Sequence, residues 1–597
     1  MNQEEIASLE TELTGLPTGS IVRRLIRGAE RFYHQWREDG TTRSRYLKPG
    51  EVEDLRAKIA RRKEIAHLLA QSPRRATTPR TPSFRTNVAV GENLVRLARG
   101  VEKFKTRDMF PDMMKYLRSD SFDRVFVVCG LRRTGKTTML RQAVLALGDK
   151  ERAKAAYAKM TERDSMALLR ADLETLHGAG YKYIFIDEVT LMEDFIDTAG
   201  VLSDIFAGMG MKIVLSGTDS LGFWFAERDE LYDRAFTLHT TFIPFREHAR
   251  LLGTDDVDTY INFGGTLRAG ELLFSHADAK NDAASFRDDE TTRFYIDTAI
   301  ARNIQRSLRC VDGGRHFRLL IDLYEAGELT NAVNRIIEDM NHRFVLHTLT
   351  REFESSDLKL ASRNLARTEN PGRRTDAILK ADIRRVTARL MEILDIRHAE
   401  DLKIGLTDAC AAQIREYLQA LDLIVPCSIE FDGATGEHSE RVLFSQPGMR
   451  HAQAQALVFA LMNDPSFASV SARERKIVAD AILDEVKGRM LEDIVLLETI
   501  KARGDGNTSA FKFQFAAGEF DMVVADRNHA TCEIYEIKHS TVANDRQLRH
   551  LVDPKKLAAT ERRYGTILSR TVIYRGEGFV HASGVVYRNV AEYLKSL

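Results

Sequence analysis

The chain has 597 residues, 44% of them hydrophobic and 29% charged, which is typical of a soluble globular protein with roughly three or four domains. Lys plus Arg and Asp plus Glu each number 87, so no overall charge indicates nucleic acid, although a local basic patch is allowed. The five cysteines form no C-x-x-C pair, which favours free thiols over a disulfide or zinc framework. Because no signal-peptide core or apolar run of membrane-spanning length is present, we expect a cytoplasmic protein without a membrane partner.

Residues 1–70 are predicted to form a charged, helical N-terminal extension. Apolar residues recur at helical spacing in IVRRLIRGAERFYHQW and again in VEDLRAKIARRKEIAHLLA. Arginines interleaved with Phe32, Tyr33 and Trp36 could stack on nucleic acid, but an amphipathic hairpin with a solvated basic face is the favoured interpretation. Residues 71–93 begin with a stretch rich in Pro, Thr and Arg and are predicted to be a linker.

The strongest signal is RVFVVCGLRRTGKTTML at residues 124–140. An apolar run leads into a loop that opens a helix, and the loop fits the phosphate-loop pattern G-x-x-x-x-G-K-[ST]. Its glycines allow a tight turn that points N–H groups at a phosphate, and the helix N-terminus adds positive potential. Lys136 is expected to reach the β- and γ-phosphates of ATP as a catalytic residue, and Thr137 to bind Mg²⁺. The predicted nucleotide-binding residues of this loop are Gly130, Arg133, Thr134, Gly135, Lys136, Thr137 and Thr138.

Two further buried strands are predicted, each ending in polar residues. YKYIFIDE ends in Asp187 and Glu188, and a carboxylate at the end of such a strand lies beside the phosphate loop. We predict that Asp187 holds Mg²⁺ and that Glu188 polarises the attacking water, as its counterpart does in related ATPases. MKIVLSGTDS predicts a strand between the other two, with Ser216 near the γ-phosphate and Thr218 as the second candidate. A hydroxyl-rich turn with only local hydrogen bonds is an equal alternative.

These motifs resemble the prokaryotic AAA-type ATPases of the archaeal-ATPase group. Such proteins carry an R-x-G-K-T phosphate loop and an L-x-P-[LF]-x-F-x-E stretch, matched here by FIPFRE at residues 242–247. Their Y-x-x-x-G-G-x-P segment is matched in part by Tyr260, Gly264 and Gly265, although Thr266-Leu267 replaces the usual proline. The resemblance covers roughly residues 94–310.

The resemblance implies an α/β fold with a parallel-sheet ATPase core at residues 94–255 and a helical lid and connector at 256–375. It also implies that Arg234 lies close to the nucleotide, the alternative being a solvent-exposed arginine. Residues 402–425 have the form of a winged-helix unit, which we place at 376–445. Such a unit can bind DNA or another protein.

Residues 446–597 hold a second set of chemistry-bearing residues. A predicted helix carries Glu492, a strand pair carries Asp521, and CEIYEIK carries Glu536 and Lys538. This order resembles the core of PD-(D/E)xK nucleases, an α/β restriction-endonuclease-like fold in which Gln547 also matches a polar position. Strand alternation puts Glu536 and Lys538 on one face.

In that resemblance, Asp521, Glu536 and Lys538 would be catalytic, with Asp521, Glu536 and Glu492 as metal ligands. A nuclease-like fold retained as a scaffold is an equal alternative. Three functions therefore compete: an ATPase coupled to a metal-dependent nuclease, an ATP-driven switch whose C-terminal domain binds a protein partner, and a DNA-binding ATPase that does not cut. Each could act as an oligomer.

Overall fold

The computed structural model describes residues 9, 11–26, 29–38, 41–71, 83–218, 223, 226, 230–240, 242–267, 286, 288–301, 317–354, 407–433, 438–465, 471–504 and 506–597. The chain divides into two compact units, Met1–Ser83 and Phe84–Leu597, which are treated separately below. Among the described residues, no helix combines the length and the apolar character that crossing a membrane would need.

The N-terminal unit contains a three-stranded antiparallel sheet in the order β1 (Ser20–Ile26), β2 (Ala29–Glu38), β3 (Thr41–Leu47), followed by helix α2 (Val52–Gln71). Helix α2 was predicted, but the helix expected over IVRRLIRGAERFYHQW is wrong. The sequence Asp39-Gly40 is a strong hairpin signal. In a hairpin, the aromatic residues beside it follow the two-residue period of a strand and not the 3.6-residue period of a helix.

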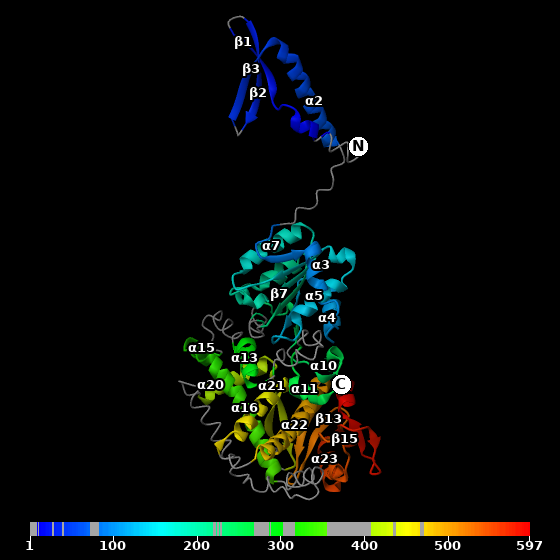
Figure 1. Cartoon of the computed structure of the whole chain (residues 1–597). Helices are drawn as coiled ribbons and strands as arrows, with labels where there is room; N and C mark the ends of the chain where they lie inside the picture. The colour runs from blue at the N-terminus through cyan, green and yellow to red at the C-terminus, as the bar shows by residue number, and fades with distance from the viewer. Residues whose placement is uncertain are drawn as a thin grey trace. The chain divides into compact units, whose positions relative to one another are not determined.

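The second unit begins with a six-stranded sheet in the order β4-β6-β7-β8-β5-β9 (Figure 1). Strands β5 (Val125–Cys129), β6 (Ala155–Lys159), β7 (Tyr183–Asp187), β8 (Lys212–Gly217) and β9 (Ala235–His239) are parallel. The predicted central position of β8 is confirmed. Strand β4 (Asn87–Val90), antiparallel to β6, falls within the segment expected to be linker, so the sheet starts earlier than predicted.

Helices cover both faces of this sheet because successive residues of its buried strands alternate between two cores. Phe126 and Val128 share a core with helices α3 (Gly91–Arg99), α4 (Phe110–Arg118) and α5 (Lys136–Ala146). Val125 and Val127 face the other core, which includes α7 (Met166–Gly178). Every residue of β5, β7 and β8 is buried, as the continuous apolar runs indicated.

An eight-stranded sheet forms the C-terminal part, in the order β11-β10-β12-β13-β14-β15-β17-β16. Its strands are β10 (Ile424–Phe431), β11 (His438–Phe444), β12 (Thr508–Gln514), β13 (Glu519–Asp526), β14 (Thr531–Ile537), β15 (Thr566–Tyr574), β16 (Phe579–Val580) and β17 (Val586–Asn589). The long helix α22 (Ala472–Arg503) packs on it beside α21 (Pro447–Met462), and α23 (Pro554–Tyr564) and α24 (Val590–Ser596) complete this part.

The β10–β11 hairpin lies where the wing of the winged-helix unit was expected. It joins the C-terminal sheet through parallel pairing of β10 with β12, so it is not a separate small sheet. The preceding helix α20 (Asp408–Ala420) shares a core with α15 (Arg318–Glu325). Residues 376–406 of the expected unit lie outside the described residues.

Between the two sheets, the chain forms helices α10 (Phe245–Leu252), α11 (Val257–Phe263), α13 (Asp289–Ile296), α15 and α16 (Leu329–Glu354). Helices α10 and α11 share one hydrophobic core with α22 and α24. The backbone N–H of Phe245 donates to Glu498 Oε1 of α22 at 2.7 Å. The first turn of α10 is therefore attached to the C-terminal part by a buried hydrogen bond.

Burial raises the pKa of Glu498 from its ordinary value of 4.5 to about 8. Because the folded protein holds this proton more tightly than the unfolded chain, the carboxyl lowers stability progressively as the pH rises from about 4.5 to about 8. We expect Glu498→Gln to raise the urea midpoint at pH 8 and to leave it nearly unchanged near pH 4.5. Equal shifts at both pH values would contradict this assignment.

Candidate functional site

The phosphate loop lies between the carboxyl end of β5 and the start of α5, as predicted. Gly130, Arg133 and Gly135 all have positive φ, and Gly135 stands directly before α5 with φ of 89°. A glycine adopts this conformation at little cost, which explains its place at the start of the helix. The Thr134 hydroxyl is buried and bonds the Leu131 carbonyl and the Thr240 hydroxyl, both at 2.9 Å, so this side chain supports the loop from within the fold.

Lys136 is buried, and its Nζ donates to the carbonyls of Gly130 and Leu131 at 2.7 Å each. The ammonium therefore lies inside the curve of the loop. Burial lowers the pKa of Lys136 to about 8, although the nearby carboxylates of Glu188 and Asp187 act in the opposite direction. A polyanion bound in the loop would favour the charged ammonium further.

Asp187 is the centre of the polar contacts at the end of β7. Its Oδ2 accepts from Thr137 Oγ1 at 2.8 Å and from Tyr157 OH at 2.6 Å, and its Oδ1 accepts from Ser216 Oγ. Burial and the charge of Asp187 raise the pKa of Tyr157, which keeps this phenol a hydrogen-bond donor. A hydroxyl and a carboxylate in contact are oxygen ligands of the kind that Mg²⁺ takes, so Thr137 and Asp187 fit this cation.

Glu188 follows β7 in a left-handed backbone conformation with φ of 58°. A non-glycine residue in this region is strained by roughly 1–3 kcal/mol, and such strain is concentrated at functional sites. Its Oε2 accepts from Thr218 Oγ1 at 3.2 Å. The two hydroxyl residues predicted after β8 therefore contact different carboxylates, Ser216 binding Asp187 and Thr218 binding Glu188.

A buried ion pair that the motifs did not predict supports the loop. Arg107 donates through Nε and Nη2 to the two carboxylate oxygens of Glu247 at 2.6 and 2.9 Å, and its Nη1 donates to the Thr134 carbonyl. The two side chains are 4% and 2% exposed. Glu247 is the last residue of the FIPFRE stretch, so the family motif indicated one residue of this ion pair. Arg107, 140 residues earlier, had no recognisable signal.

A cavity of about 320 Å³ adjoins the loop. Gly135 and Thr138 of the loop lie on the wall of this cavity, together with apolar side chains and two lysines. The remaining lining residues are Lys103, Phe104, Lys105, Arg107, Gln142, Leu251, Leu252, Gly253 and Leu267. Thr138, predicted from the motif alone, thus faces this cavity.

Arg234 is the predicted nucleotide-binding residue that the structure does not bring to the loop. It precedes β9, whose first residue pairs with Val125, whereas the phosphate loop follows Cys129 at the opposite end of β5. Its side chain is 44% exposed and forms an ion pair with Asp204 at 3.0 Å. Arg234 therefore matches the alternative of a solvent-exposed arginine. It lies at the start of β9, and the starts and the carboxyl ends of parallel strands lie at opposite edges of the sheet.

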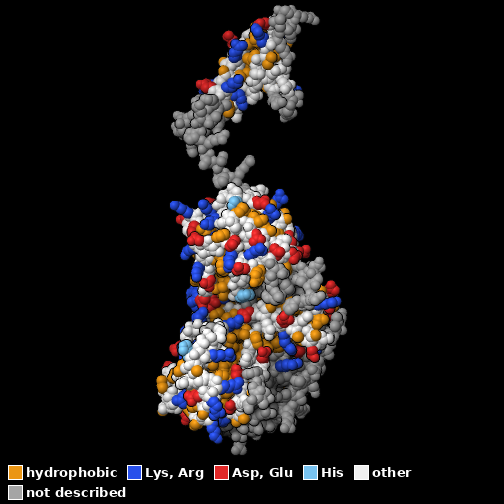
Figure 2. All heavy atoms as spheres, turned by 180° about the vertical axis from the view of Figure 1, so that it is seen from behind, with side chains coloured by type: hydrophobic (Ala, Val, Ile, Leu, Met, Phe, Trp, Pro, Cys, Tyr) orange, Lys and Arg blue, Asp and Glu red, His pale blue; other side chains and the backbone are white. Residues whose placement is uncertain are grey.

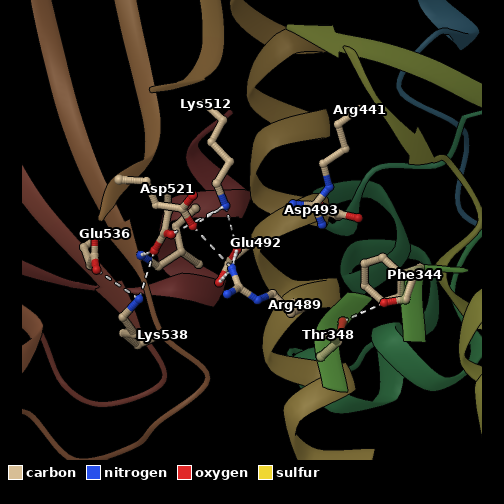
Figure 3. A network of polar contacts seen from close by, with 12 residues as sticks. Phe344, Thr348, Arg441, Arg489, Glu492, Asp493, Lys512, Asp521, Glu536 and Lys538 are labelled. Carbon is tan, nitrogen blue, oxygen red and sulfur yellow. Dashed lines mark hydrogen bonds and ion pairs between the residues drawn. The ribbon is translucent and has the colours of Figure 1, made fainter. Parts of the chain in front are cut away.

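The C-terminal candidates also lie together, on β13, β14 and α22 (Figure 3). Lys538 Nζ contacts Asp521 Oδ2 at 3.0 Å and Glu536 Oε1 at 3.1 Å. Burial and the charge of Asp521 raise the pKa of Glu536 to about 8, against the opposing effect of Lys538. Gln547 lies in a short 3-10 helix, Asp545–Leu548, where it caps the backbone N–H of Asn544 at 3.2 Å rather than contacting the cluster.

Two further cations that the sequence analysis did not consider enter this cluster. Lys512 Nζ of β12 lies 2.7 Å from Glu519, 3.4 Å from Glu492 and 3.9 Å from Asp521 (Figure 3). Arg489 contacts Glu492 at 2.7 Å. Burial would raise the pKa of Glu492, but the charges of Arg489 and Lys512 outweigh it and the pKa is lowered.

The predicted ligands Glu492, Asp521 and Glu536 are thus occupied by lysine and arginine. Among the residues that the structure describes, no three or more His, Cys, Asp or Glu side chains group in a way that could hold a metal ion. The donor set does not fit a metal as it stands, whereas Thr137 and Asp187 do.

Residues 122–249 match the AAA domain family. The matched segment runs from just before β5 to α10 and contains the phosphate loop, Asp187, Glu188, Ser216 and the FIPFRE stretch. Residues 2–57, which contain β1 to β3, match a second family described as a domain of unknown function, DUF6788. Together the two matches leave the C-terminal sheet without an assigned family.

Solved structures similar to the chain include a Saccharomyces cerevisiae Hsp104–ADP complex, at 11% identity and a TM-score of 0.23, covering 69% of this chain and 54% of that one. Another is the Aeropyrum pernix Orc1 protein in complex with DNA, at 14% identity and a TM-score of 0.20, covering 64% of this chain and 95% of that one. The chain thus spans about half the length of the Hsp104 chain that it matches. No curated protein matches it.

Proposed function

We propose that the AAA domain binds ATP with Mg²⁺ and hydrolyses it. The observation that carries this proposal is the convergence of the phosphate loop, Asp187, Ser216 and Glu188 at one edge of the sheet. Asp187 accepts hydrogen bonds from Thr137 and Ser216, and Glu188 accepts one from Thr218. Lys136 and the loop N–H groups bind the phosphates, and Thr137 with Asp187 would hold Mg²⁺, which supplies charge neutralisation when bound. Glu188 orients the attacking water.

The adjoining cavity suits the base and ribose of the nucleotide. Its volume of about 320 Å³ is at the lower end of the range for small-molecule sites, and Phe104, Leu251 and Leu267 offer apolar surface for a flat ring. Gly135 and Thr138 belong to both the loop and the cavity wall, so one ligand can fill both.

We propose further that the C-terminal domain acts as a partner-binding domain under the control of the AAA domain rather than as a metal-dependent nuclease. The four carboxylates of its cluster, Glu492, Glu519, Asp521 and Glu536, face the three cations Arg489, Lys512 and Lys538. These cations supply the positive charge that a metal would bring in a nuclease. Such a network, in which cations offset most of the carboxylate charge, holds strands and helix together without a bound ion.

Contacts that could carry control run through α10. Glu247 of α10 holds the arginine that bonds the phosphate loop, and Phe245 of the same helix bonds Glu498 of α22. Glu492, two turns before Glu498 on α22, belongs to the C-terminal cluster. A change at the loop can therefore reach that cluster through two packed helices.

A cleavage assay distinguishes a partner-binding C-terminal domain from a nuclease. It uses linear and circular DNA and RNA, in Mg²⁺ or Mn²⁺, with and without ATP. We expect the wild type to cleave no more nucleic acid than Lys136→Ala, Glu536→Ala or Lys538→Ala does. ATP hydrolysis by Glu536→Ala should stay within about twofold of the wild-type rate. Cleavage that is lost in Glu536→Ala and Lys538→Ala but kept in exposed Lys555→Ala would overturn the scaffold assignment and establish a nuclease.

A further inference from the structure

The sheet of the N-terminal unit has two different faces. His34, on β2, is 9% exposed and Leu47, on β3, is 1% exposed, and α2, which contacts β1, carries the buried Ile59 and Ile65. Residues at alternate positions of a strand point to opposite faces. Arg31, Tyr33 and Gln35 of β2 therefore lie on the face away from this core.

Two tyrosines mark that outer face. Tyr33 and Tyr46 are directly opposite each other in the β2–β3 pairing, with ring centroids 5.6 Å apart and an interplanar angle of 64°. The Tyr46 side chain is an exposed large residue, 47% accessible, and the Arg31 guanidinium lies 5.9 Å from the centre of its ring. Gln35 and Ser44 form the next outward pair along the strands.

The surroundings of this face are basic although the whole chain has no net charge. Residues 20–48 contain three acidic residues and eight lysines and arginines, of which Arg23, Arg43 and Arg45 pair with residues of the opposite face. Figure 2 shows one side of this unit, on which Lys and Arg side chains lie among hydrophobic and a few acidic side chains. The exposed Tyr46 and the half-buried Tyr33 offer ring surface for stacking, and Arg31 beside them offers positive charge for phosphates.

We propose that the outer face of the β1–β3 sheet binds single-stranded nucleic acid. Unpaired bases stack on Tyr33 and Tyr46, and a phosphate between them lies against Arg31 on the same face. In a duplex the base faces are stacked inside the helix, so a duplex can bind this face only through contacts between its phosphates and the basic residues. The site is thus distinct from the nucleotide site and stands whether or not ATP is hydrolysed.

The test uses the full-length protein and fluorescence anisotropy with labelled oligothymidine, oligouridine and a DNA duplex at low and moderate salt. The double variant Tyr33→Ala/Tyr46→Ala should weaken single-strand binding by at least about tenfold, because each stacked base contributes to affinity. Duplex binding should change little. Tyr232→Ala, which removes an exposed tyrosine of the AAA domain, should leave both unchanged and serves as the matched control.

Tyr33→Phe/Tyr46→Phe separates ring stacking from hydrogen bonding, since it keeps the rings and removes the hydroxyls, and unchanged duplex binding by the alanine pair shows that its sheet is still folded. Retained single-strand binding in this variant, with loss in the alanine pair, supports the proposal. Three results would overturn it: no single-strand binding by the wild type, unchanged binding by the alanine pair, or equal affinity for the duplex and the single strands that falls only when Arg31 is replaced.

Discussion

Replacing Lys136 by alanine should lower kcat/KM for ATP hydrolysis by at least about a hundredfold, comparable to removing a key transition-state donor. The Lys136 ammonium lies within the loop, 2.7 Å from the Gly130 and Leu131 carbonyls. When the phosphates bind, it exchanges these carbonyls for phosphate oxygens whose charge grows in the transition state. Steady-state phosphate release and binding of a fluorescent ATP analogue measure turnover and affinity separately.

Lys150→Ala is the matched control, because Lys150 is an exposed lysine of the same domain, on α6 (Asp149–Arg152). It should keep wild-type turnover. Glu188→Gln should instead keep nucleotide binding and lose turnover, since the amide cannot polarise water as a carboxylate does. Wild-type hydrolysis by Lys136→Ala would remove the basis for placing ATP in this loop.

The geometry of the proposed ATP site could be predicted from the sequence because its signals are local. A buried parallel strand is a short continuous apolar run, and polar residues at the ends of such runs gather at one edge of the sheet. Three runs of this kind, ending at Cys129, Ile186 and Leu215, are therefore enough to bring Lys136, Asp187 and Ser216 together. Asp521, Glu536 and Lys538, which also lie side by side, were placed instead by strand alternation and by the resemblance to the nuclease core.

What the sequence left undetermined depends on contacts between distant segments. The apolar residues of IVRRLIRGAERFYHQW fit both the period of a helix and the two-residue period of a strand. The segment forms strands because β2 pairs with both β1 and β3. Lys512 enters the C-terminal cluster only because β12 and β13 are neighbours in one sheet, which no spacing rule reveals. Arg234 was placed by resemblance alone, and the direction of β9 puts it at the other edge.

The largest effect on stability should come from the buried pair of Arg107 and Glu247. Arg107→Ala leaves a buried carboxylate without its cation, which costs about 3–5 kcal/mol. The urea midpoint of the Phe84–Leu597 unit, followed by circular dichroism, should fall accordingly. Arg170→Ala breaks an exposed pair with Glu174, whose side chains are 52% and 59% accessible, and should cost no more than about 0.5 kcal/mol.

A compensated double variant separates the two roles of this pair. Arg107→Met with Glu247→Leu fills the site with apolar side chains, so much of the stability should return, because well-packed hydrophobic replacements of buried ion pairs are often neutral or stabilising. ATP turnover should not return, since the Thr134 carbonyl of the phosphate loop has still lost its donor from Arg107. If turnover recovers together with stability, the pair only holds α10 in place. If stability alone recovers, Arg107 is a positioning residue of the ATP site, and α10 connects that site to the C-terminal domain.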